Sequence, residues 1–149
     1  MNNIGDLKDK AILFGWIAGL LIIIASLWIL TQPLQANNLL RTVNNVFISA
    51  GDSRRLLRYE GVSRERPGLL GYWYSMYNSV NKMFVFPVFQ DGILVPLGAI
   101  VSANGTVEEI IPLSAHAAQT FDSMPRSILQ IYVTRIEAEA LVNMRGRNR

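Results

Sequence analysis

The sequence predicts an α+β protein: a single N-terminal transmembrane helix followed by a small extracytoplasmic domain, an antiparallel β-meander flanked by helices. Three observations lead to this prediction. An uninterrupted apolar run fills residues 11–30. Aromatic and β-branched residues cluster between turn residues from residue 71 onward, and apolar residues recur at helical spacing on either side of that region. The 149 residues have room for one domain and an anchor, so a second domain is not expected.

The apolar run from Ala11 to Leu30 has the length of a membrane-spanning helix. It carries no charged residue, and at about 1.5 Å per residue it covers the roughly 30 Å hydrocarbon core of a bilayer. A cleaved signal peptide is the alternative, because residues 34–36, Leu-Gln-Ala, weakly resemble a cleavage pattern. The apolar region of such a peptide is normally only about 7–15 residues long, so the sequence favours an uncleaved span.

Basic residues beside the run predict its orientation. Lys8 and Lys10 precede it, whereas only Arg41 lies at a comparable distance behind it. Because cytoplasmic flanks are enriched in lysine and arginine, residues 1–10 are predicted to be a short cytoplasmic N-terminus. The C-terminal domain of this single-pass, bitopic protein is then expected on the periplasmic side of a bacterial inner membrane.

Small residues mark one side of the predicted span. Gly15 and Gly19 form a small-xxx-small pair, over which the backbone of another helix can approach closely. Chance is the alternative explanation, because glycine and alanine are common in membrane helices. The residues predicted to pack against a partner helix are Ala11, Gly15, Ala18, Gly19 and Ser26.

Residues 31–51 are predicted to continue as a juxtamembrane amphipathic helix that Gly51 ends. Residues 52–145 are then the α+β domain, and residues 146–149 a basic tail. Asp52 or Ser53 is expected to cap a short helix through Arg58. Further on, Ser114 is expected to cap a second short helix, and a longer helix is predicted from Pro125 to a stop at Gly146, with an apolar stripe comprising Leu129, Tyr132, Val133, Ile136 and Ala140.

Four strands are predicted between these helices. Tight hairpins are expected at Asp91-Gly92 and Asn104-Gly105, because these pairs readily adopt positive φ. Pro87 and Pro96 lack an amide donor, so their strands should have an edge, a bulge or a break there. The first strand has a helical alternative, since Leu69, Trp73, Met76 and Val80 also fit a helix face. The predicted strands are Gly71–Tyr77, Met83–Gln90, Ile93–Val101 and Thr106–Leu113.

The sequence contains no pattern typical of an enzyme. It has no cysteine, and its one histidine, His116, has no cluster of carboxylates at ligand spacing. Ser114 and Asp122 could form a triad with His116 only through the fold, because their spacing gives no local support. The acidic pairs Glu108-Glu109 and Glu137/Glu139 are interpreted as solvated, and phosphate-binding glycine motifs are absent. No catalytic residue, cofactor or metal is therefore predicted.

Two groups of side chains are candidates for a partner or ligand surface. The aromatic group is the densest outside the apolar run, and sheet core is its alternative interpretation. The arginine group could meet an acidic partner, although neighbouring carboxylates reduce its excess charge, and solvated charge is its alternative. The aromatic group is Tyr72, Trp73, Tyr74 and Tyr77, and the arginine group is Arg54, Arg55 and Arg58.

The sequence as a whole predicts a non-enzymatic, membrane-anchored accessory or assembly subunit. Its expected partners are the subunits of a larger membrane complex or another copy of the chain, together with the lipid bilayer. Nucleic acid is not an expected partner, since the net charge is only +3 and the domain is predicted to face outward. The alternative is an anchored, sensor-like module that binds a small ligand.

Overall fold

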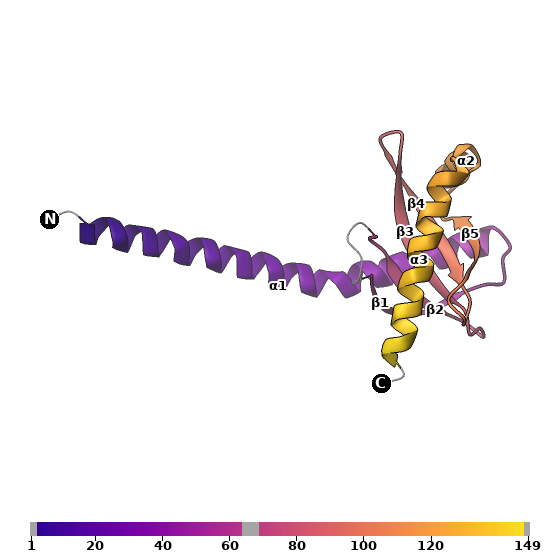
Figure 1. The fold of residues 1–149 in the computed structure, drawn as a ribbon, viewed down its shortest axis with the longest axis horizontal. Helices are drawn as coiled ribbons and strands as arrows, with labels where there is room; N and C mark the ends of the chain where they lie inside the picture. Colours follow the sequence, from indigo (N-terminus) through magenta and orange to yellow (C-terminus); the bar gives the residue numbers. More distant parts are fainter. Residues whose placement is uncertain (1–2, 64–68, 148–149) are drawn as a thin grey trace. The chain divides into compact units, whose positions relative to one another are not determined.

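The structure, a computed structural model, describes residues 3–63 and 69–147. Side chains are described for these residues except at 3–9, 11, 28–30, 32–33 and 144–147. The chain divides into two compact units, Met1–Asn38 and Leu39–Arg149. Helix α1, Asn3–Ser49, makes up the first unit and contributes its last turns to the second (Figure 1).

The predicted transmembrane span is contradicted. Across the described part of the chain, no helical stretch combines the length and the apolarity needed to cross a bilayer. The side chains described within the apolar run are those of residues 12–27. This finding overturns the span at 11–30, the single-pass membrane localisation and the periplasmic placement of the domain. An uninterrupted apolar run does not identify its own surroundings, since helices buried within large proteins are also apolar on every side.

The second unit contains a five-stranded antiparallel sheet in the order β1-β2-β3-β4-β5, so the predicted α+β class with a meander is confirmed. The first predicted strand is indeed a strand rather than a helix, and Asp91 and Gly92 form the β3–β4 turn with φ of 50° and 80°. The strands are β1 Leu56–Val62, β2 Tyr72–Met76, β3 Lys82–Gln90, β4 Ile93–Val101 and β5 Val107–Pro112.

Strand β1 replaces the short helix predicted after Asp52, which is wrong. The side chain of Asn44, on α1, accepts a hydrogen bond from the Leu56 amide at 2.7 Å and donates one to the Leu56 carbonyl at 3.0 Å. Leu56 is thereby held extended and buried at the edge of the sheet, where it pairs with Met76. A contact between residues 12 positions apart thus overrides the local helical pattern.

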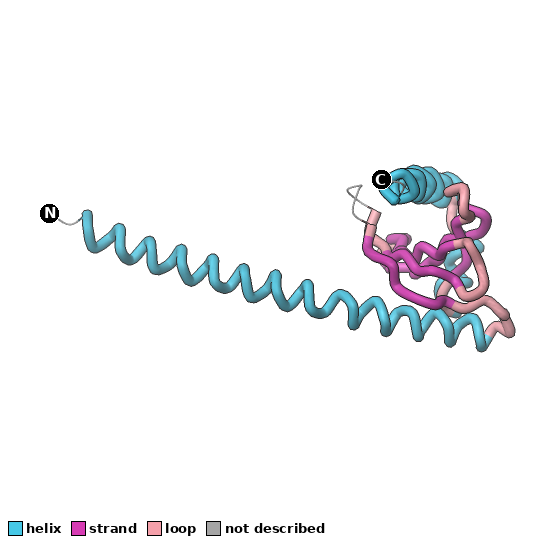
Figure 2. Tube along the Cα trace, turned by 90° about the horizontal axis from the view of Figure 1, so that it is seen from below, coloured by secondary structure: helices cyan, strands magenta, loops and turns pink. Residues whose placement is uncertain are grey.

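Helices cover both faces of the sheet within the second unit (Figure 2). Val43 and Phe47 of α1 pack on one face, the α1 side, together with Met83 and Val85 of β3. Helices α2, Ala115–Ser123, and α3, Arg126–Arg147, pack on the opposite face, the α3 side.

Ser114 caps α2 as predicted, and the Ala117 amide donates to its hydroxyl at 3.0 Å. The α3 helix continues through Gly146, so the predicted stop there is wrong.

Strands β3 and β4 form a long hairpin that extends beyond its neighbours. The pairing of β3 with β2 reaches only Val85, and the pairing of β4 with β5 reaches only Leu97. Pro87 and Pro96 lie opposite each other beyond these limits, so of the edge, bulge or break predicted at each proline the structure shows the end of a neighbouring pairing. Hydrogen-bonded and non-hydrogen-bonded pairs alternate along the hairpin, and the backbone of both prolines therefore faces outward, away from the partner strand. Pro96 accepts a hydrogen bond from the Leu113 amide at 3.0 Å on that outer side.

Candidate functional site

The first candidate site is the apolar part of α1. Large apolar side chains between Ile12 and Leu27 are exposed on every side of the helix, with Trp16 76% and Leu21 59% exposed. A Cβ atom added at Gly15 or Gly19 would meet nothing within 4 Å, so the helix surface is open at both glycines. Of the other residues predicted to pack there, Ala18 and Ser26 are exposed, and the side chain of Ala11 lies outside the described residues. The Ser26 hydroxyl donates a hydrogen bond to the Ile22 carbonyl of the same helix.

The aromatic group does not form one surface. Tyr72 and Tyr74 point to the α1 side of the sheet, where both rings lie about 6 Å from Tyr59, whereas Trp73 points to the α3 side. Tyr77 is exposed beyond the end of β2. Burial, followed by the neighbouring Tyr72 and Tyr59, raises the pKa of Tyr74 well above its ordinary value. Alternation along a strand therefore separates residues that are adjacent in the sequence.

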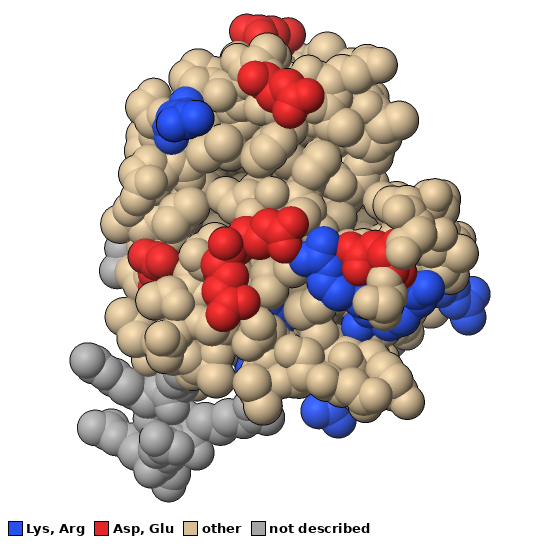
Figure 3. All heavy atoms as spheres, turned by 90° about the vertical axis from the view of Figure 1, so that its right-hand side faces the viewer, with Lys and Arg blue, Asp and Glu red and all other residues tan. Residues whose placement is uncertain are grey.

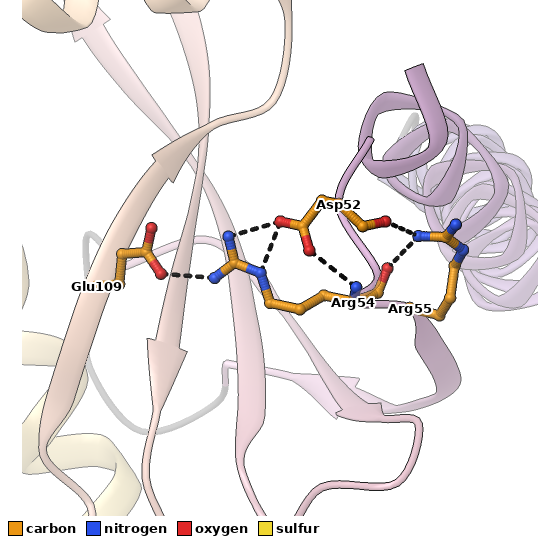
Figure 4. Close-up of polar contacts among 4 residues, drawn as sticks. All are labelled: Asp52, Arg54, Arg55 and Glu109. Atoms are coloured by element: carbon orange, nitrogen blue, oxygen red, sulfur yellow. Dashed lines mark hydrogen bonds and ion pairs between the residues drawn. The ribbon is translucent and has the colours of Figure 1, made fainter. Parts of the chain in front are cut away.

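Two residues of the arginine group are engaged within the domain (Figure 4). Arg54 forms ion pairs with Asp52 at 2.6 Å and with Glu109 at 2.5 Å, and its guanidinium carbon lies 5.7 Å from the centre of the Phe47 ring. Arg55 donates to the carbonyls of Asp52 and Arg54 at 2.5 Å. Hydrogen bonds to Asp52 and Glu109 raise the pKa of Arg54 further above its ordinary value. We call these contacts among Asp52, Arg54, Arg55 and Glu109 the arginine clasp. They join the segment after α1 to β5.

Figure 3 shows acidic and basic side chains lying next to one another in a band on one face of the molecule. Charges of opposite sign at such separations reduce each other's field. This face therefore offers a partner a mixture of charges rather than a surface of one sign.

The arginine clasp predicts a loss of stability in acid. Its hydrogen bonds from Arg54 hold the pKa of Asp52 below the ordinary value of 3.8. The folded state therefore favours the ionised carboxylate, and the stabilisation is present above pH 3.8 and is lost as the pH falls through the folded pKa. Because the pair is partly exposed, we expect a contribution of about 0.5 kcal/mol.

Urea unfolding of the Asp52→Asn variant, measured between about pH 2 and 6, should show a smaller decline toward acid than the natural chain. Asp122→Asn is the matched control, because Asp122 is an exposed carboxylate on α2. Identical acid dependence in the Asp52→Asn variant and the natural chain would show that the clasp does not contribute.

The second candidate site is a cleft of about 830 Å³ on the α3 side of the sheet, beside β1. Helix α3 packs chiefly against β4 and β5, and its residues Ala140 and Asn143 reach the cleft. We call this site the β1 cleft. Its lining combines charged, aromatic and aliphatic side chains from the sheet with two positions of α3: Arg58, Glu60, Val62, Trp73, Lys82, Val101, Ala140 and Asn143.

A buried carboxylate lies next to the β1 cleft. Glu139 of α3 is only 1% exposed, and it accepts hydrogen bonds from the Ser63 hydroxyl at 2.5 Å and from the Trp73 indole at 3.2 Å. The interpretation of Glu139 as solvated is therefore wrong. The signal in the sequence is its position three residues after Ile136, on the apolar stripe of the helix. Glu139 fixes the Trp73 indole that lines the cleft.

The catalytic candidates are not brought together. The Ser114 hydroxyl is engaged at the start of α2, and the side chains of His116 and Asp122 are exposed on that helix. Glu109 belongs to the arginine clasp, and Glu108 accepts a hydrogen bond from Asn81 at 2.9 Å. Among the residues that the structure describes, no group of three metal-ligating side chains is close enough to hold an ion.

The α1 surface and the β1 cleft are therefore two candidate binding surfaces in the part of the chain that the structure describes. Neither depends on a catalytic side chain. No protein-family model, curated protein or solved structure matches this chain.

Proposed function

We propose that this chain is a non-enzymatic assembly subunit that binds an apolar helix of another protein chain through residues 12–27 of α1. The observation that supports the proposal is the exposure of eleven large apolar side chains in this stretch. Five of them are consecutive, from Leu20 to Ile24. At 3.6 residues per turn these five encircle the helix, so apolar surface faces every direction.

Exposed apolar surface of this extent favours association. Removing apolar area from water contributes about 25 cal/mol per Å², or about 1.5–3 kcal/mol for each large side chain that becomes fully buried. Exposed single leucines are ordinary on protein surfaces, whereas a contiguous apolar surface marks an interaction site. A helix that is apolar on all sides is accordingly one that is covered in its assembled state.

We propose that the partner helix packs over Gly15 and Gly19. They are four residues apart and so lie one above the other on the same side of α1. Since no atom lies within 4 Å of either missing Cβ, a partner backbone can approach there more closely than over Trp16 or Leu20. Isoleucine at both positions would fill this depression and push the partner outward.

A photocrosslinking amino acid at position 16 tests the proposal in cells. We expect a protein adduct whose crosslinked peptide is an apolar helical segment, either from a different chain or from a second copy. The Gly15→Ile/Gly19→Ile variant should lose most of that adduct, about tenfold, which corresponds to roughly 1.4 kcal/mol of packing energy.

The matched control is Asn37→Ile/Arg41→Ile, which places two isoleucines at the same spacing on exposed positions of α1 outside the apolar stretch. This control should keep the adduct. Absence of any protein adduct, together with flotation of the chain on lipid vesicles, would contradict the proposal. Retention of the full adduct by the glycine variant would exclude Gly15 and Gly19 as the packing side.

A further inference from the structure

We propose that the β1 cleft binds a small carboxylate that carries an apolar body. The cleft lies wholly within the second unit, so this inference does not depend on the assembly function proposed for α1. At about 830 Å³ it is within the range of cavities that hold small molecules, about 300–1,000 Å³. Three features of its lining identify the chemistry of the ligand.

The first feature is an apolar floor. Trp73 and Val101 belong to the core on the α3 side of the sheet, and both reach the cleft. Val62 on β1 and Ala140 on α3 also line the cleft, and because Trp73, Val101 and Ala140 are only 2–6% exposed, each offers a ligand a small apolar contact. An aliphatic or aromatic ligand body placed there would be removed from water against side chains that are already ordered.

The second feature is an arginine at the cleft for which the described residues supply no ion-pair partner. Lys82 and Glu60 form an ion pair at 2.5 Å, so they neutralise each other. Arg58 is exposed at the cleft, and among the described residues its guanidinium makes no ion pair. A guanidinium binds a carboxylate through two parallel hydrogen bonds, which makes Arg58 the residue that would hold the acidic end of the ligand.

The third feature is the fixed position of the Trp73 side chain. Glu139 accepts the indole N–H of Trp73 from within the core and does not line the cleft. The indole is therefore oriented before any ligand arrives. A side chain that is already ordered lowers the entropic cost of binding, because the ligand does not need to order it.

Fluorescence of Trp73 provides a direct measurement. The chain has three tryptophans, so Trp16→Phe/Trp28→Phe leaves Trp73 as the single reporter in the full-length protein. Titration with 3-phenylpropanoate should give a saturable change in its emission. The uncharged amide of this acid and propanoate, which lacks the apolar body, should each bind about tenfold or more weakly.

Variants of Arg58 then separate charge recognition from a change in structure. Arg58→Gln should weaken binding of 3-phenylpropanoate about tenfold or more, and Arg58→Lys, which keeps the charge, should recover part of that loss. Arg126→Gln is the matched control, since Arg126 is an exposed arginine at the start of α3 and does not line the cleft. It should bind like the parent chain.

Equal affinity for the acid and its amide would overturn the proposal, as would unchanged binding by Arg58→Gln. Absence of any saturable response to 3-phenylpropanoate would overturn it as well. None of these results bears on the crosslinking of α1, so the two proposals fail separately.

Discussion

Replacing Phe84 with alanine is expected to destabilise the second unit by about 3–5 kcal/mol. The Phe84 side chain is 0% exposed, and its ring centre lies 4.7 Å from that of Trp73 and 5.7 Å from that of Phe86. A Cβ atom at Gly71 would overlap this ring, which shows how closely the surroundings fit it. Truncation therefore loses both the transfer free energy of the ring and the contacts around the resulting cavity.

Urea unfolding followed by Trp73 fluorescence, again in the Trp16→Phe/Trp28→Phe chain, measures this loss. Phe89→Ala is the matched control, because Phe89 lies on the same strand and is 67% exposed. We expect the control to change the free energy of unfolding by no more than about 0.5 kcal/mol. Similar losses for both variants would mean that Phe84 is not part of the cooperative core.

Replacing Glu139 with leucine is expected to cost about 2–4 kcal/mol of unfolding free energy. The leucine side chain accepts no hydrogen bond, so the Trp73 indole N–H and the Ser63 hydroxyl lose their buried partner. Each unsatisfied buried donor costs about 1–3 kcal/mol. Glutamine keeps one acceptor oxygen at this position, and Glu139→Gln should therefore cost only about 1 kcal/mol.

A double-mutant cycle with Trp73→Phe distinguishes the lost hydrogen bond from a general packing defect. Phenylalanine has no N–H, so Glu139→Leu should cost less in a Trp73→Phe chain than in the natural one. Circular dichroism during urea unfolding provides the measurement, because this cycle removes the fluorescent reporter. Strictly additive losses would mean that the contact between these two side chains does not contribute to stability.

Local sequence patterns predicted the parts of the fold that local chemistry determines. Asp91 and Gly92 form a tight turn because both accept positive φ, and Ser114 caps α2 because its hydroxyl can reach the Ala117 amide. The apolar stripe of α3 was predicted for the same reason, and Ile136 and Ala140 are buried in the core. Each of these features depends on residues within about one or two turns of one another.

The remaining features depend on contacts between distant parts of the chain. Strand β1 forms because Asn44 binds the backbone of Leu56, and a local pattern that favoured a helix could not reveal that partner. Glu139 is buried because Ser63 and Trp73, 76 and 66 residues away, meet its carboxylate. The β1 cleft is lined by residues of β1, β2, β4 and α3, segments that are far apart in the sequence and that no local spacing brings together. The sequence shows that residues 12–27 are apolar, but it does not show which molecule covers them.

The paired prolines of the β3–β4 hairpin limit how this sheet can associate with other chains. Exposed sheet edges recruit strands from other chains through rows of free amides and carbonyls. At Pro87 the outward position lacks an amide, so an incoming strand would lose a ladder hydrogen bond there, and the outward carbonyl of Pro96 is already bonded to the Leu113 amide. The hairpin can therefore expose Phe89 and Leu94 with a reduced tendency to seed edge-to-edge aggregation. Contacts made there would involve side chains rather than a shared sheet.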